Sequence, residues 1–398
     1  MAGEAAPPFA TDAGRPSPGP TAGAAEPPAT AGDLPLIEEA ALHLYRLYDL
    51  GYGIDLERAR ATLAAPSARM RPVLTRGASI DMPEPPLVVS LGESLVALEG
   101  MSLRAHIDAR VYDLGIVALR LVVDLPAPLT WDRAADLLGE ALGVPQRATD
   151  LLAPTIEALR RTLRLAVERP NATPLVEDYA ALVVARLGPG TPAARLGAHP
   201  SLLRASLGER HPLGRAAAAL ATTLSYYEDD LILLTWSAAI VVDSDPTARE
   251  DATFLLEVAN AQLLAFRAYD AQVARDLREV APRLRRTRRL HWWELGAATR
   301  FQYEIHSLIL DSVETSARAE NALKVTEDVY WNRVYAAAHA TLRLEVWRRG
   351  TERTLDALER AAALIAGEAA AARTLLLEWL IIALIAVELL VAIVGLRH

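Results

Sequence analysis

The chain contains no cysteine, although it is 398 residues long. This absence excludes disulfides, thiolate catalysis, zinc–thiolate sites and iron–sulfur clusters. The eight histidines show neither HExxH nor HxxxH spacing, and the sequence has no P-loop, no Rossmann GxGxxG loop and no GxSxG nucleophile elbow. We therefore expect no metal and no cofactor, and no small-molecule substrate is evident.

Acidic residues outnumber basic ones, 50 to 41, and long apolar runs are scarce. The formal net charge is −9, so contact with nucleic acid or anionic lipid would require a local basic patch. One long apolar run closes the sequence, which argues against a polytopic membrane protein. The first residues lack a basic n-region and an apolar h-region, so they do not form a secretory signal.

The composition changes along the chain and predicts four parts. Residues 1–34 are rich in proline, alanine and glycine, and we expect a disordered tail because nothing there can form a core. An α+β domain is predicted for residues 36–246 and a helical region, with a potential coiled coil, for residues 247–373. Residues 374–396 are predicted to be a C-terminal transmembrane anchor.

Strand and helix patterns define the α+β part. Apolar and polar residues alternate over Leu103–Val111, which predicts a half-buried strand. The apolar run Ile116–Leu125 follows a short turn, so the two form a hairpin. Thr130 is expected to cap a helix over Trp131–Leu142. The fold class is thus α+β, with a ferredoxin-like or similar antiparallel sheet and helices.

A short motif occurs twice in this part, as RLYDLG at Arg46–Gly51 and RVYDLG at Arg110–Gly115. Two related strand–helix units would produce such an echo. Shared strand-and-turn composition would produce it as well.

The remaining pattern is mostly helical. Leu231–Trp236 and Ile240–Val242 read as short strands, and helices are expected over Leu213–Leu224, Thr247–Arg278, His291–Ala319, Val325–Arg349 and from Thr351 to the end. In the last helix Leu355, Ala362, Ala369 and Leu376 are seven residues apart, as are Leu358, Ile365, Ala372 and Trp379. Such a seam packs either against the preceding helices or in a homo-oligomeric coiled coil.

The closing segment LEWLIIALIAVELLVAIVGLRH raises the question of a membrane anchor. Leu375–Leu396 would span about 33 Å as a helix, enough for a bilayer core. Glu378 and Trp379 would lie at the membrane entrance, whereas Glu388 would lie near the middle and face a neighbouring helix or be protonated. A buried core helix is the alternative. The predicted partners are therefore the lipid bilayer and further copies of the chain.

Acidic and polar residues invite a catalytic interpretation. Consecutive carboxylates at Glu228, Asp229 and Asp230 point in alternate directions on a strand, so turn polarity explains them better than a metal site. On the next helix Glu257, Asn260, Arg267 and Asp270 follow helical spacing, and Arg267 can pair with Asp270. They form either a polar network that docks the helix on the sheet or a catalytic cluster.

The strongest basic feature is PRLRRTRRLHWWE. It contains Arg283, Arg285, Arg286, Arg288 and Arg289, followed by Trp292 and Trp293. Arginines fork onto phosphates, and tryptophans stack on bases or lie among lipid headgroups. Contact with RNA, contact with anionic lipid and a solvated helix face all remain open.

Four blocks of sequence resemble the required-for-meiotic-nuclear-division family in order and spacing. They are SYYEDDLILLTWSAAIVVD (Ser225–Asp243), LLEVANAQLLAFRAYD (Leu255–Asp270), NALKVTEDVYWNRVYAAA (Asn321–Ala338) and LEWLIIALIAVELL (Leu377–Leu390). The blocks contain a set of polar and aromatic candidate site residues: Tyr226, Tyr227, Glu228, Asp229, Asp230, Trp236, Glu257, Asn260, Gln262, Arg267, Asp270, Lys324, Glu327 and Asp328.

The resemblance implies an α+β first part, a helical second part and a C-terminal transmembrane helix. Mitochondrial members are inner-membrane proteins that face the matrix and support translation, and the family offers no established catalytic residue. This sequence lacks a mitochondrial presequence pattern, which favours a bacterial cytoplasmic membrane with the bulk of the chain in the cytoplasm.

Two functions follow as hypotheses. The first is a non-enzymatic, membrane-tethered scaffold that oligomerises and recruits a partner, for which the resemblance points to the ribosome or RNA. The alternative is a membrane-bound enzyme or ligand-binding regulator that uses the polar cluster between the sheet and the first long helix.

Overall fold

The computed structural model divides the chain into two units, Met1–Leu34 and Pro35–His398. The structure describes residues 36–63, 67–69, 80–147, 149–171, 174–188, 190–287, 303, 307, 309–310, 314, 317–321, 324–325 and 328–395. All of these residues belong to the second unit, so the predicted tail lies outside the described residues.

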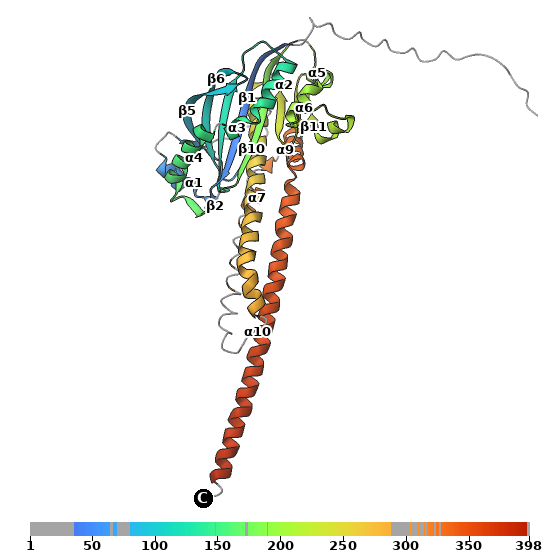
Figure 1. Cartoon of the computed structure of the whole chain (residues 1–398). Helices are drawn as coiled ribbons and strands as arrows, with labels where there is room; N and C mark the ends of the chain where they lie inside the picture. Colours follow the sequence, from blue (N-terminus) through green and yellow to red (C-terminus); the bar gives the residue numbers. More distant parts are fainter. Residues whose placement is uncertain are drawn as a thin grey trace, which may run out of the picture. The chain divides into compact units, whose positions relative to one another are not determined.

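Ten strands form the main sheet of the second unit (Figure 1). They lie in the order β11-β12-β13-β10-β1-β7-β6-β5-β3, and β8 pairs with the start of β1. Their bounds are β1 Leu36–Asp49, β3 Ser67–Arg69, β5 Leu87–Leu98, β6 Met101–Val111, β7 Ile116–Asp124, β8 Leu129–Thr130, β10 Val176–Leu187, β11 Thr222–Leu224, β12 Leu231–Leu234 and β13 Ala238–Val242. Separate pairs are formed by β2 (Gly51–Ile54) with β9 (Val167–Pro170) and by β4 (Ile80–Asp81) with β14 (Lys324–Val325).

The four central strands lie in the order β10-β1-β7-β6, and every neighbouring pair is antiparallel. Helix α1 (Leu56–Thr62) lies between β1 and β6 along the chain, and α2 (Trp131–Ala141), α3 (Val144–Arg147) and α4 (Thr149–Leu163) lie between β7 and β10. This is a β-α-β-β-α-β order with strands inserted and added. Since β10 and β13 are parallel, the complete sheet is mixed and larger than the predicted one.

Local patterns placed several of these elements correctly. The alternation over Leu103–Val111 is strand β6, and the apolar run after it is β7. Gly115 in the turn between them has a φ of 81°, and a Cβ there would lie 1.9 Å from the carbonyl oxygen of Gly51. Glycine is therefore required at that turn. Thr130 caps α2 as predicted, because its Oγ1 accepts a hydrogen bond from the backbone N–H of Arg133 at 3.2 Å.

Side chains alternate between the two faces of the sheet, and each face has its own core. The first core contains Leu42 and Leu44 of β1 and is covered by α2, α4 and α6 (Pro200–Ser206), the helix that follows α5 (Pro192–Ala198). The second core contains Tyr45 and Leu47 and is covered by α7 (Pro246–Thr287), α9 (Val329–Thr341) and the start of α10 (Leu344–Gly395).

The repeated RxYDLG motif does not mark a structural repeat. Leu47 and Arg110 both pair with Ala118 of β7, so the two copies are one residue out of register. A shift of one residue moves side chains to the opposite face. Accordingly, Tyr48 packs in the first core and Tyr112 in the second. The motif therefore occurs twice because the two segments share strand-and-turn composition, and not because of an internal duplication.

Two helix predictions were wrong. Leu213–Leu224 forms only a short 3₁₀ helix, η2 (Arg215–Leu220), because the residues after it form β11 and pair with β12. The expected break at Gly350 lies inside α10. The chain bends instead between α9 and α10, where Arg343 has a φ of 53° and the neighbouring Leu342 and Leu344 are buried in the second core. The predicted helix His291–Ala319 lies mostly outside the described residues.

Helices α7 and α10 run side by side below the sheet (Figure 1). Leu355, the first residue of the predicted seam, packs against Tyr269 and Val273 of α7, so at this position the seam is used within the chain. Ala362, Ala369 and most of the other seam side chains lie outside the described residues. The predicted transmembrane anchor over residues 374–396 is not confirmed, because none of the helices, as far as the structure describes them, has the length and apolar character needed to cross a membrane.

Candidate functional site

A buried carboxylate docks α7 on the sheet. The Glu257 side chain is 0% exposed, and its Oε2 accepts a hydrogen bond from Nη1 of Arg110 at 2.9 Å. Its other oxygen, Oε1, accepts the hydroxyl of Tyr112 at 2.7 Å. Since Arg110 and Tyr112 stand at the end of β6, the contacts join the helix to the centre of the sheet. Of the four residues predicted to form a docking network, Glu257 makes these contacts.

The network extends to a second arginine on the neighbouring strand. Arg120 of β7 donates to Oδ2 of Asp108 from Nε at 2.9 Å and from Nη2 at 2.7 Å. Glu250 of α7 lies 3.5 Å from both Arg110 and Arg120. Three carboxylates therefore surround two guanidinium groups, and opposite charges are interleaved throughout.

The environment of Glu257 favours structure over catalysis. Burial raises the pKa of Glu257, and this effect exceeds the opposing influence of Arg110 and Arg120. Burial also raises the pKa of Tyr112 well above its ordinary value. Arg110, the main partner, is only 2% exposed. Glu257 and its main partner therefore have almost no surface exposed to solvent.

The acidic triplet before β12 does not converge on the network. Asp230 is buried, and its two oxygens accept the backbone N–H groups of Tyr226 at 2.7 Å and Tyr227 at 3.1 Å. Glu228 and Asp229 are exposed. Asp230 thus caps the backbone of the turn that precedes it, which is a common role of polar residues in turns. No group of three acidic or histidine side chains suited to a metal ion occurs in the described part of the chain.

Aromatic residues of the same block lie at the surface. Tyr226 is 57% exposed, Tyr227 54% and Trp236 41%. The Tyr226 ring packs against Tyr330 of α9, with centroids 5.3 Å apart. Two of the sequence blocks therefore meet in space here.

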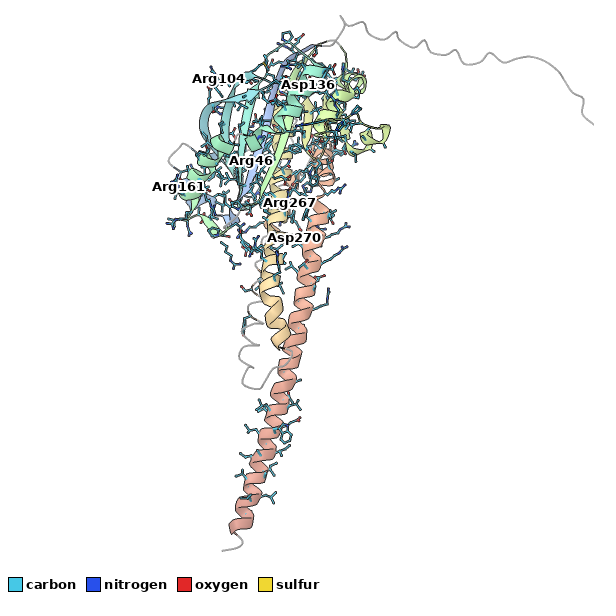
Figure 2. The ribbon with its side chains drawn as sticks, in the orientation of Figure 1. Arg46, Arg104, Asp136, Arg161, Arg267 and Asp270 are labelled. Atoms are coloured by element: carbon cyan, nitrogen blue, oxygen red, sulfur yellow. The ribbon has the colours of Figure 1, made fainter. Side chains whose placement is uncertain are left out.

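The other polar residues of α7 have separate partners. Asn260 donates to the backbone oxygen of Leu256 within the helix at 2.8 Å. Arg267 pairs with Glu177 of β10 rather than with the predicted Asp270, and its guanidinium lies 5.9 Å from the ring centre of Trp347 on α10. Both Arg267 and Asp270 lie on the part of α7 beside α10 (Figure 2).

Gln262 joins α7 to α9 at the edge of a cavity. Its Oε1 accepts the hydroxyl of Tyr335 at 2.7 Å and faces Nε2 of His339 at 2.9 Å, while its Nε2 donates to the backbone oxygen of Ala319 at 2.7 Å. Burial lowers the pKa of His339 to about 4, so the ring is neutral at pH 7, and the contact with Gln262 is a hydrogen bond in the tautomer that carries its hydrogen on Nε2. Sequence reasoning missed Tyr335 and His339, although their spacing of four residues places them on one helix face.

That cavity has a volume of about 490 Å³ and is lined by both charged and apolar side chains. Glu320, Glu345 and Arg348 line it together with Gln262 and His339. The guanidinium of Arg348 already donates hydrogen bonds to Glu345 and Glu352, at 2.7 Å each. The predicted residue Gln262 thus lies at a pocket, but Glu257 and Asp230 do not contribute to it.

The third sequence block contributes a helix cap. Oδ1 of Asp328 accepts the backbone N–H groups of Tyr330 at 2.6 Å and Trp331 at 3.0 Å, which starts α9. Lys324 belongs to the short strand β14, whereas Glu327 lies outside the described residues.

The side chains of the predicted basic patch lie outside the described residues. The backbone of Arg283, Arg285 and Arg286 forms the end of α7, and their side chains lie outside the description. Arg288, Arg289, Trp292 and Trp293 also lie outside the described residues. Contact of this patch with RNA or lipid stays a prediction.

The end of α10 exposes apolar side chains in all directions. The large residues of Leu380–Ile385 are exposed by 51% to 66%, and six consecutive residues complete more than one helical turn. Trp379 is 70% exposed, and Glu378 and Glu388 are also exposed. A helix that is apolar all round normally lies within a larger core or a membrane.

Comparison with known families gives one match. Residues 39–248 match the family described as "Uncharacterized protein MJ0711, N-terminal domain". The match covers slightly more than half of the chain. The chain belongs to this family. The MJ0711 N-terminal domain match spans nearly all of the main sheet and the helices on its first face, and it ends just after α7 begins.

Neither the curated proteins nor the solved structures contain a match to the chain. The MJ0711 N-terminal domain family is uncharacterized, so it assigns no activity. It also differs from the family that the four sequence blocks resemble, and that finer relationship remains a proposal.

Proposed function

We propose that the chain is a non-enzymatic scaffold that the end of α10 tethers to a lipid bilayer. Its folded part lies on the cytoplasmic side, forms homo-oligomers and recruits a partner. The observation that carries the proposal is the exposed apolar surface of α10 between Leu375 and Leu390. Exposed apolar surfaces of this extent are rare on soluble monomers and mark contact with membranes or proteins.

The distribution of apolar residues around α10 favours lipid over a single partner helix. One partner helix covers a single stripe, yet the consecutive residues Leu380, Ile381 and Ile382, which point in directions about 100° apart, are exposed by 55%, 56% and 55%. Lipid tails contact all sides of a helix at once. The described apolar surface ends at Leu390, and the sequence continues the apolar run to Leu396.

Insertion energies agree with this arrangement. About sixteen strongly apolar residues contribute roughly −5 to −9 kcal/mol at about −0.3 to −0.6 kcal/mol each. One carboxylate near the middle, Glu388, opposes insertion by about 3 kcal/mol. Apolar transfer therefore outweighs the cost of the charge.

The closed network around Glu257 supports a scaffold rather than an enzyme. Its charges are paired within the chain, and α7 holds the sheet in place through them. The partner follows from the resemblance to the required-for-meiotic-nuclear-division family, whose mitochondrial members support translation at a membrane. The translation machinery is therefore the first partner to test, with Arg283–Arg289 as its contact.

Alkaline carbonate extraction of cell membranes tests the tether. We expect the full chain to stay in the membrane pellet and a chain that ends at Arg373 to appear in the supernatant. Removal of the exposed end leaves the two cores intact, so the shortened chain is expected to fold. Release of the full chain by carbonate would contradict the tether.

Sedimentation of solubilised ribosomes tests recruitment separately. We expect the wild-type chain to sediment with ribosomes at low salt and Arg285→Glu/Arg288→Glu to remain at the top of the gradient. The control Arg161→Glu/Arg164→Glu makes the same charge change at exposed positions near the end of α4. If wild type and both variants remain at the top, the ribosome is not the partner, and the tether is unaffected.

A further inference from the structure

A buried carboxylate lines a small cavity where β1 ends. Asp49 is only 2% exposed. Its Oδ2 accepts a hydrogen bond from Nδ2 of Asn171 at 2.6 Å. Its Oδ1 is also buried, and within the described residues no donor meets hydrogen-bond geometry at it, although the backbone N–H groups of Leu175 and Gly51 are near enough to lower the pKa of the carboxyl. A buried carboxylate oxygen without a partner is costly, so the site calls for a compensating group.

The cavity holds one molecule the size of water. It offers about 20 Å³ to the centre of such a molecule, and one water requires roughly 10–15 Å³ on this measure. Tyr52 lines it from β2, and Ala268, Tyr269 and Gln272 line it from α7. The lining thus combines one carboxylate with two aromatic rings.

Asp49 forms no ion pair among the residues that the structure describes. The nearest influence of opposite charge comes from Arg275, but the Arg275 side chain is exposed and its Nε donates to Oε1 of Gln272 at 3.1 Å. Burial raises the pKa of Asp49 to about 6, and the hydrogen bond from Asn171 only partly opposes this shift. A positive charge inside the cavity would offset the penalty.

We propose that this cavity binds a monovalent cation the size of a water molecule, with Oδ1 of Asp49 as its charged ligand. The ring of Tyr269 favours such an ion because aromatic rings attract cations, whereas the ring of Tyr52 already faces the guanidinium of Arg169 at 5.3 Å. A divalent ion is disfavoured, because the one carboxylate of the cavity balances a single positive charge and a second charge would remain buried without a partner. Ammonium, potassium and sodium ions share the required chemistry.

Thermal unfolding of the full chain in a zwitterionic detergent distinguishes these ions. The melting temperature is measured in the chloride salts of ammonium, potassium, sodium and tetramethylammonium at equal concentration. Tetramethylammonium is too large for the cavity and provides the reference. We expect at least one small cation to raise the melting temperature by about 2–4 °C once its concentration is several times the dissociation constant. The same melting temperature in all four salts would overturn the proposal.

Two variants locate the effect. Asp49→Asn removes the charge, and Ala268→Val fills the cavity while the carboxylate remains; both are expected to abolish the difference between salts. Asp136→Asn removes an exposed carboxylate on α2 and is expected to retain it. If Asp49→Asn does not fold, Ala268→Val makes the same comparison. A shift that survives in either folded variant would place the cation elsewhere and contradict the assignment.

Discussion

Helix α7 buries charged side chains, whereas the end of α10 exposes apolar ones. Glu257 of α7 is fully enclosed and bonded to Arg110, while Ile381 and Leu384 of α10 are exposed by 56% and 66%. A polar group can be buried at little cost in free energy when it forms hydrogen bonds, whereas the exposure of apolar surface to water is unfavourable. The charges of the α7 network are therefore paired within one chain. The apolar side chains at the end of α10 are exposed, and we propose that lipid covers them.

The largest expected effect comes from breaking the α7 network. Arg110→Ala leaves Glu257 buried without its cation, and such a loss destabilises a protein by about 3–5 kcal/mol. Chemical denaturation of the full chain in detergent measures the change. Arg104→Ala is the matched control on the same strand, because Arg104 is exposed and lies 3.6 Å from Glu93 (Figure 2). We expect the control to change the stability by less than about 1 kcal/mol.

The double variant Arg110→Met/Glu257→Leu sharpens this result. Removal of both charges avoids the unpaired carboxylate, so most of the stability lost in Arg110→Ala is expected to return. If Arg110→Ala unfolds with the same free energy as wild type, the ion pair between Arg110 and Glu257 does not stabilise the fold.

The next effect is a pH dependence at Asp49. Its pKa in the folded chain is about 6, above the ordinary value of 3.8. The folded state therefore takes up a proton first as the pH falls, and the cost of burying the charge, present at pH 7, disappears towards pH 4. Relative to Asp49→Asn, wild type should gain about 2 kcal/mol of unfolding free energy over that range.

Denaturation in tetramethylammonium chloride at pH 7 and pH 4 measures this gain without a small cation. Asp136→Asn alters an exposed carboxylate and should show a much smaller dependence (Figure 2). A constant difference between wild type and Asp49→Asn across the range would mean that Asp49 is not buried as a charged group.

The smallest effect concerns Glu388 on the exposed end of α10. Polar side chains within a membrane normally face other helices and contribute about 1 kcal/mol to association. Glu388→Leu should therefore weaken the oligomer in detergent roughly fivefold, as measured by analytical ultracentrifugation. Glu378→Leu, which lies at the entrance to the membrane in the proposed arrangement, is the control and should leave the association unchanged. An unaltered oligomer in Glu388→Leu would remove this role.

Local patterns predicted the elements whose structure depends on neighbouring residues. The alternation along β6 and the cap at Thr130 required only a few consecutive positions. The alanine-rich stretch before β11 misled the prediction because its conformation depends on pairing with β12. The bend at Arg343 depends on burial of the neighbouring leucines and carries no glycine or proline signal.

The candidate site was harder to predict because its partners are distant in sequence. Helical spacing indicated that Glu257 docks α7, but Arg110 lies 147 residues earlier. Similarly, Arg267 pairs with Glu177, 90 residues away, rather than with the nearby Asp270. Only the folded sheet shows which strand end faces which helix. The cavity beside Asp49 also required the fold, since its walls come from β2 and α7.

Flotation with liposomes tests the central claim most directly. Purified full chain and a chain ending at Arg373 are mixed with vesicles of phosphatidylcholine alone, at high salt, so that the basic segment gains nothing from anionic lipid. The account predicts that the full chain rises with the vesicles and the shortened chain remains at the bottom. A full chain that remains at the bottom as a defined oligomer would contradict it and would show that copies of α10 cover one another.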